Sequence, residues 1–149
     1  MPTDSPISDE TRQLANELRV ALHHIFRRIR QEGDDGPSGI TLLQKLLLST
    51  IGQHAGIGVA ELARLEKLRG PTISGHIKAL EKAGLVRRDT SNPDDRRRVG
   101  LHITEPGAAV LADIRNRRLD WIAERLVKLP PEGAQALRNA MTYLNQIGE

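Results

Sequence analysis

Residues 59–104 read VAELARLEKLRGPTISGHIKALEKAGLVRRDTSNPDDRRRVGLHIT, and this stretch decides the fold of the chain. Within it, Pro71 predicts the start of a helix, because the first helical position needs no backbone N–H and the proline ring fixes φ near the helical value. The apolar residues that follow recur with the helical period: Ile73, Ile77 and Leu80. Gly84 stands where a left-handed residue commonly ends a helix. One helix is therefore predicted over residues 71–83, with one face in a core and the other free for a ligand.

A shorter helix is predicted immediately before this one. Its apolar positions fit one helical face: Val59, Leu62, Ala63 and Leu65. Residues 67–70, KLRG, supply a tight turn that contains a glycine. Two short helices joined by such a turn are typical of a helix-turn-helix.

A basic ribbon follows the second helix. Residues 85–88 and 98–103 have strand character, and the polar loop between them contains turn-forming residues and ends in three consecutive arginines. Asp94 and Asp95 balance part of that charge, which leaves an arginine available for the negatively charged minor groove of DNA. A solvated hairpin is the alternative interpretation of this segment. The direct succession of a helix-turn-helix and a basic ribbon favours a DNA-binding winged helix-turn-helix.

The same residues resemble a known family. The run NPDDRRRVGLHITEPG, at residues 92–107, is similar to the wing of MarR-type regulators, and GPTISGHIKALEKAGLVRR, at residues 70–88, resembles their recognition helix and the strand after it. In that family the helix enters the major groove, and an arginine of the wing enters the minor groove beside an orienting aspartate. The resemblance assigns these roles to Ser74 and its neighbours, to Arg97 and to Asp95.

The resemblance is specific over residues 57–107 and departs from the family at Gly75, where many members carry a long basic residue. It implies a sequence-specific regulator of transcription that binds double-stranded DNA, a repressor released by a small molecule. The expected DNA contacts are Arg69, Thr72, Ser74, Gly75, His76, Lys78, Arg88, Asp95, Arg96, Arg97 and Arg98. A ligand-independent repressor and a winged-helix module for protein interaction without DNA binding are the alternatives.

Helices are also predicted on both sides of this region. Ser8 predicts an N-cap for a helix that runs to Gln31, and Thr41 with Gln44 forms a capping-box pattern for a second helix that ends near Gly52. Two further amphipathic helices, interrupted by Pro130-Pro131, are predicted beyond Thr104. The expected fold is therefore mainly α with a small β-wing.

One regulator unit is expected over residues 1–149, with a winged helix-turn-helix at 40–104 and dimerisation helices at 8–31 and 105–149. Long amphipathic helices without catalytic groups favour a twofold homodimer, which would bind an inverted-repeat operator. The alternative is that these helices pack within one chain. The resemblance also implies a small aromatic or anionic effector, and its candidate contacts are His23, Phe26, Arg27 and Trp121.

Composition excludes several other classes. The chain has 149 residues, a net charge of +3 and no cysteine, which excludes disulfides, thiolate metal sites and thiol-based redox sensing. Its five histidines show no metal-ligand spacing, and neither a nucleophile elbow nor a phosphate loop occurs. We therefore expect no catalytic residues, metal or cofactor, and no enzyme activity. No apolar run approaches the roughly 20 residues of a membrane span, and the acidic N-terminus lacks a signal peptide, so a cytoplasmic protein without a membrane partner is expected.

Overall fold

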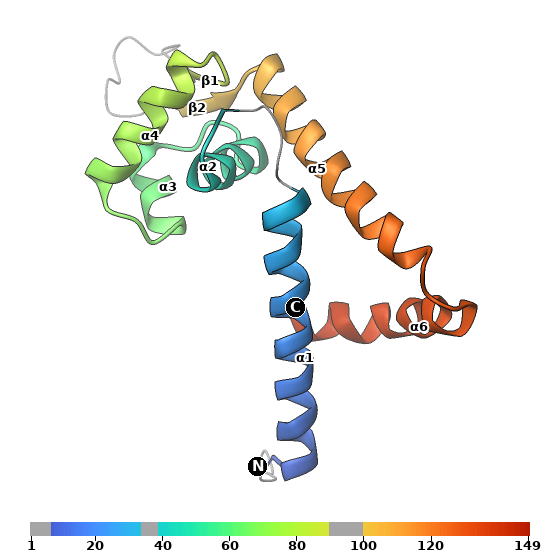
Figure 1. Ribbon diagram of the computed structural model, residues 1–149. Coiled ribbons are helices and arrows are strands. Elements are labelled where there is room, and N and C mark those ends of the chain that lie inside the picture. Colours follow the sequence, from blue (N-terminus) through green and yellow to red (C-terminus); the bar gives the residue numbers. More distant parts are fainter. Residues whose placement is uncertain (1–6, 34–38, 90–99) are drawn as a thin grey trace. The chain divides into compact units, whose positions relative to one another are not determined.

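The computed structural model describes residues 7–33, 39–89 and 100–149. By contacts, the chain divides into two compact units: a central unit, Gly36–Asn116, and a terminal-helix unit, Met1–Asp35 with Arg117–Glu149. In chain order the elements are α1 (Asp9–Arg28), η1 (Ile29–Gly33), α2 (Leu42–Gln53), α3 (Val59–Leu65), α4 (Gly70–Lys82), β1 (Val86–Asp89), β2 (Gly100–Ile103), α5 (Glu105–Leu126) and α6 (Pro131–Gly148) (Figure 1). The predicted fold class, mainly α with a two-stranded wing, is confirmed.

The central unit is organised around one apolar core. Its fully buried side chains come from α2, α3, α4 and β2: Leu47, Leu48, Ile51, Leu62, Ile73, Ile77, Leu80 and Leu101. The apolar stripe predicted for the second helix of the helix-turn-helix is thus the stripe that α4 buries. Its opposite face remains at the surface.

The start of α2 was correctly predicted, and its end at Gln53 lies one residue beyond the predicted Gly52. The backbone N–H of Thr41 donates to Gln44 Oε1 at 2.9 Å and the N–H of Gln44 donates to Thr41 Oγ1 at 3.2 Å, which completes the capping box. The helix then continues through Gly52 to Gln53. A Cβ at Gly52 would lie only 3.3 Å from Leu111 Cδ1, so this glycine allows α2 to pack closely against α5 rather than ending the helix.

The turn between α3 and α4 lies where it was predicted, and it contains a left-handed residue other than its glycine. Lys67 has a φ of 53°, whereas Gly70 is the first residue of α4. The N–H of Leu68 donates to Ala63 O at 3.0 Å and that of Lys67 to Arg64 O at 3.3 Å. This is a Schellman cap, and the two hydrogen bonds together with the packing of Leu68 on the core offset the strain at Lys67.

The end of α4 has the same cap with the predicted residue. Gly84 has a φ of 75°, its N–H donates to Glu81 O at 3.0 Å, and the N–H of Leu85 donates to Leu80 O at 3.0 Å. Strand β1 begins one residue later and pairs antiparallel with β2. An isolated antiparallel bridge also joins Ile57 to Leu101 of β2.

The terminal-helix unit contains α1, η1, α6 and the second half of α5. Ser8 caps α1 by accepting a hydrogen bond from the N–H of Thr11, as predicted. The predicted α-helix to Gln31 is wrong in its last turn, because residues Ile29–Gly33 form a π-helix. Neither α1 nor α6 contains a fully buried side chain. No helix among the described residues has both the length and the apolar character to cross a lipid bilayer.

Candidate nucleic-acid interface

Helix α4 presents a polar face opposite its buried stripe. Pro71, Thr72, Gly75 and Lys78 are exposed, and Ser74 is half-buried. At Gly75 no heavy atom lies within 4 Å of where a Cβ would stand, so packing within the described residues does not require a glycine here. This face is free to meet another molecule, and Lys78 gives it positive charge.

The start of α4 is also accessible. Arg69 is the N-cap residue and is exposed, and among the described residues no side chain accepts a hydrogen bond from the first-turn N–H groups. Uncapped N–H groups at a helix start, beside an arginine, suit a phosphate oxygen. His76 lies at the edge of this face, where its ring Nδ1 is 3.5 Å from Nε2 of Gln44 on α2.

The wing begins as a regular two-stranded ladder. Its register pairs Val86 with Ile103 and Arg88 with Leu101. Arg88 extends toward α4, where its Nε donates to Glu81 Oε1 at 2.8 Å. On the other face of the ladder, Nε2 of His102 lies 3.6 Å from Asp89 Oδ2. The wing is thus tied to α4 by an ion pair as well as by the backbone.

The tip of the wing lies outside the described residues, and with it the predicted contacts Asp95, Arg96, Arg97 and Arg98. The other predicted contacts lie on α4, at its N-cap and on β1. The structure adds two exposed basic residues to this region, Lys82 in the last turn of α4 and Arg87 on β1. The spacing of four residues between Lys78 and Lys82 was the sequence signal for the first of them.

The terminal-helix unit contains a separate hollow of about 570 Å³. Its lining combines apolar and basic side chains: His23, Phe26, Ile29, Arg30, Arg118 and Ile122. Two of the four predicted effector contacts, His23 and Phe26, are therefore brought together. Arg27 is exposed in the last turn of α1 and is not among the lining residues, nor is Trp121.

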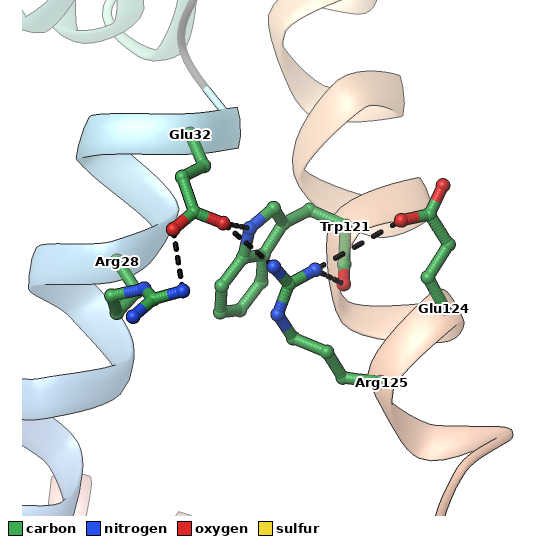
Figure 2. A network of polar contacts seen from close by, with 5 residues as sticks. All are labelled: Arg28, Glu32, Trp121, Glu124 and Arg125. Carbon is green, nitrogen blue, oxygen red and sulfur yellow. Dashed lines mark hydrogen bonds and ion pairs between the residues drawn. The ribbon is translucent and has the colours of Figure 1, made fainter.

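Trp121 instead belongs to a polar network between η1 and α5 (Figure 2). Its indole N–H donates to Glu32 Oε2 at 2.9 Å, and Arg125 both stacks over its ring, 3.6 Å from the centroid, and pairs with the same oxygen at 2.6 Å. Arg28 pairs with the other oxygen of Glu32. The indole hydrogen bond and the two arginines hold the pKa of Glu32 below its usual range.

A short helix-turn-helix followed by a two-stranded ribbon defines the winged helix-turn-helix class of DNA-binding proteins. Comparisons agree with this class. The MarR family model matches residues 40–99. A transcriptional regulator of the helix-turn-helix type from Mycobacterium leprae is 30% identical over 139 residues, which cover 93% of this chain and 95% of the relative.

Two further comparisons add to this. The helix-turn-helix transcriptional repressor NicR of Pseudomonas putida is 31% identical over 110 residues, covering 74% of this chain and 68% of NicR. The crystal structure of a Thermotoga maritima transcriptional regulator superposes with a TM-score of 0.77 at 27% identity, over 89% of this chain and 94% of that one. The chain belongs to the MarR family and is a DNA-binding transcriptional regulator.

Proposed function

We propose that this protein is a repressor that binds an inverted-repeat operator as a homodimer, with α4 of each subunit in the major groove. The observation that carries the proposal is the division of α4 into a fully buried stripe and an exposed face with Lys78. Repression is supported by the likeness to NicR, which is a repressor. Residues 40–104 would read the DNA in this proposal, and residues 8–31 and 105–149 would dimerise.

The contacts divide into two kinds. Ser74 and Lys78 would meet base edges, with Gly75 allowing the backbone of α4 to approach, while Thr72 and His76 flank them. Arg69 and Arg88 would meet backbone phosphates. At the tip of the wing, Arg97 would enter the minor groove, oriented by Asp95 and flanked by Arg96 and Arg98.

Selection from a random duplex library tests this function directly. The enriched sites should be inverted repeats whose half-sites are centred about 10 bp apart or slightly more, because a twofold dimer presents two helices about one DNA turn apart. A folded dimeric protein that enriches no duplex would instead favour a winged-helix module for protein interaction.

Dimerisation is supported by apolar surface that one chain leaves uncovered. Large apolar side chains are exposed along both terminal helices: Leu14, Val20, Ile25 and Phe26 on α1, and Leu137, Met141, Tyr143 and Ile147 on α6. Burying one such side chain contributes about 1.5 to 3 kcal/mol. A second copy of the chain presents the same surfaces, so a twofold interface covers both sets at once.

Removing residues 131–149 tests the dimer. The truncated protein should be a monomer or an aggregate in analytical ultracentrifugation and should lose tight binding to a duplex with two half-sites. A truncated protein that sediments as a folded dimer would contradict this interface.

Release by a small aromatic or anionic effector is supported by the hollow in the terminal-helix unit. Its volume of about 570 Å³ lies in the usual range for small-molecule sites, which is roughly 300 to 1,000 Å³. Phe26 offers an aromatic contact there, and His23 and Arg30 offer polar and cationic contacts. Arg27 and Trp121 would then act from beside the hollow.

Benzoate and benzyl alcohol form a matched pair of probes, alike in the ring and different in charge. Benzoate at millimolar concentration should release the operator in a fluorescence-anisotropy titration, and Arg30→Ala should abolish this effect while benzyl alcohol has none in either protein. If benzoate and other small aromatic acids leave operator binding unchanged, the ligand-independent repressor is the better account.

A further inference from the structure

An acidic residue stands on the side of α4 that the proposed function turns toward DNA. Glu81 follows Ser74 by seven residues and Lys78 by three, so the three side chains lie along one side of the helix. A carboxylate at this position should repel the phosphates on either side of the major groove. Glu81 would therefore weaken DNA binding unless a cation compensates its charge or the carboxylate positions another group.

The partner of Glu81 is Arg88 on β1. Its Nε donates to Glu81 Oε1 at 2.8 Å, while 27% of the Glu81 side chain and 34% of the Arg88 side chain remain exposed. The pair connects two elements, because Glu81 is in the last turn of α4 and Arg88 is held in the ladder opposite Leu101.

The geometry leaves most of the guanidinium available. Arginine has five N–H donors in a planar fork, and Glu81 occupies the one on Nε. Within the described residues, the side chain of Arg88 makes no other hydrogen bond. Its two Nη groups, which match a phosphate in a bidentate arrangement, are thus presented by a side chain whose orientation is already fixed.

We propose that Glu81 is a positioning residue of the DNA interface, which holds Arg88 by Nε so that the Nη groups bind a backbone phosphate beside the groove that α4 enters. The inference rests on the proposed function. The contact between Arg88 and the phosphate then costs less side-chain entropy, because Glu81 already orders the arginine before DNA binds.

The inference predicts an unusual sign. Removing an acid near DNA should strengthen binding if charge alone matters, because the repulsion of phosphates is lost. If Glu81 positions Arg88, Glu81→Ala should instead weaken binding, by about tenfold, as for the loss of one charge-assisted hydrogen bond. The slope of log affinity against log salt should also fall, by up to about 0.9, the value for one whole phosphate contact.

The experiment measures operator affinity across a salt series for Glu81→Ala, Glu81→Gln, Arg88→Ala and the double variant. Arg88→Ala should lose at least as much as Glu81→Ala, which keeps the charge of the arginine, and the double variant should lose no more than Arg88→Ala. Glu81→Gln keeps an acceptor for Nε, so it should stay within about threefold of the wild type, since a neutral acceptor forms the weaker bond.

Glu61→Ala is the matched control. It removes the same charge from the central unit and also breaks an ion pair, that of Glu61 with Arg64 at 3.7 Å. Both residues of this exposed pair lie in α3, so the pair does not connect two elements. The affinity of Glu61→Ala should equal or exceed that of the wild type. Circular dichroism at the assay temperature verifies that each variant is folded.

Three results would overturn the inference: Glu81→Ala binding as tightly as the wild type or more tightly, Arg88→Ala leaving affinity and salt slope unchanged, or Glu61→Ala losing as much as Glu81→Ala. Each of these presupposes that the wild type binds its operator. A wild type that selects no duplex contradicts the proposed function itself, so the two failures are distinguishable.

Discussion

Replacing Gly107 by alanine should destabilise the central unit, because the first turn of α5 lies directly against the turn that ends α4. A Cβ at Gly107 would stand 2.2 Å from Leu85 O and 2.8 Å from Ile103 Cγ1. Leu85 cannot move away freely, since its N–H is held by Leu80 O and its carbonyl accepts from the N–H of Thr104, both at 3.0 Å.

The size of the loss follows from three contributions. Overpacking a well-filled site costs typically 1 to 3 kcal/mol, and a contact with backbone belongs near the upper end, about 3 kcal/mol. Displacing Leu85 O weakens its hydrogen bond from Thr104, at about 1 kcal/mol. Alanine is better than glycine in a helix by about 1 kcal/mol. The net expectation is a loss of about 3 kcal/mol in the free energy of unfolding.

Urea denaturation followed by circular dichroism measures this change, with all variants at one protein concentration because a dimer's stability depends on it. Gly75→Ala is the control, since its Cβ would meet no heavy atom within 4 Å, and it should gain about 0.5 to 1 kcal/mol. The packing of α5 described above would be refuted if Gly107→Ala were as stable as the wild type. It would also be refuted if Gly107→Ala and Gly75→Ala changed the free energy of unfolding in the same direction.

Three further predictions concern the network, the wing and the inducing signal. The pKa of Glu32 is lowered because its charged form binds Trp121 and the arginines, so this interaction is complete above pH 4.5 and is lost as the pH falls through the lowered pKa. The fluorescence of Trp121, the single tryptophan, should report this acid transition. A Glu32→Gln protein that still shows the transition would contradict the assignment. Arg97→Ala should weaken binding to operator and random duplexes alike and lower the salt slope by about one, with Asp95→Ala a partial mimic; unchanged binding to random duplexes and an unchanged slope would make the wing a bystander. A low concentration of peroxide should not cause a loss of operator binding that a thiol reductant reverses, because the chain has no thiol. Loss of operator binding that dithiothreitol reverses would contradict this.

The elements that the sequence predicted well are those with local signals. The cap at Ser8, the capping box of Thr41 and Gln44, and the glycine cap at Gly84 depend on residues within a few positions of one another, and all three are present. The buried stripe of α4 follows from a period of 3.6 residues for the same reason. Local chemistry therefore sufficed for the winged helix-turn-helix.

The errors arose where tertiary contacts override local preference. A left-handed lysine is disfavoured by itself, yet Lys67 adopts this conformation because Leu68 packs on the core and two hydrogen bonds close the cap. Gly52 lies inside α2, which ends one residue later, and Leu111 occupies the space that a side chain at Gly52 would fill. No sequence pattern within one helix indicates such neighbours.

The candidate site shows the same division. Lys78 could be placed on the free face of α4 from periodicity alone, whereas the pairing of Arg88 with Glu81 depends on how β1 returns beside the helix. Trp121 was expected to line a pocket as an isolated aromatic residue. Its partner Glu32 lies 89 positions away in the chain, beyond the reach of a local pattern.

The central claim is that the exposed face of α4 reads bases, and the discrimination of Lys78→Ala between operator and random duplex tests it most directly. Lys128→Ala removes the same charge from an exposed position in the terminal-helix unit and serves as the control. One base contact contributes about 1 to 3 kcal/mol of discrimination, so the ratio of the two affinities should fall at least about fivefold for Lys78→Ala and stay constant for Lys128→Ala. A Lys78→Ala protein that keeps the wild-type ratio would contradict base reading by α4.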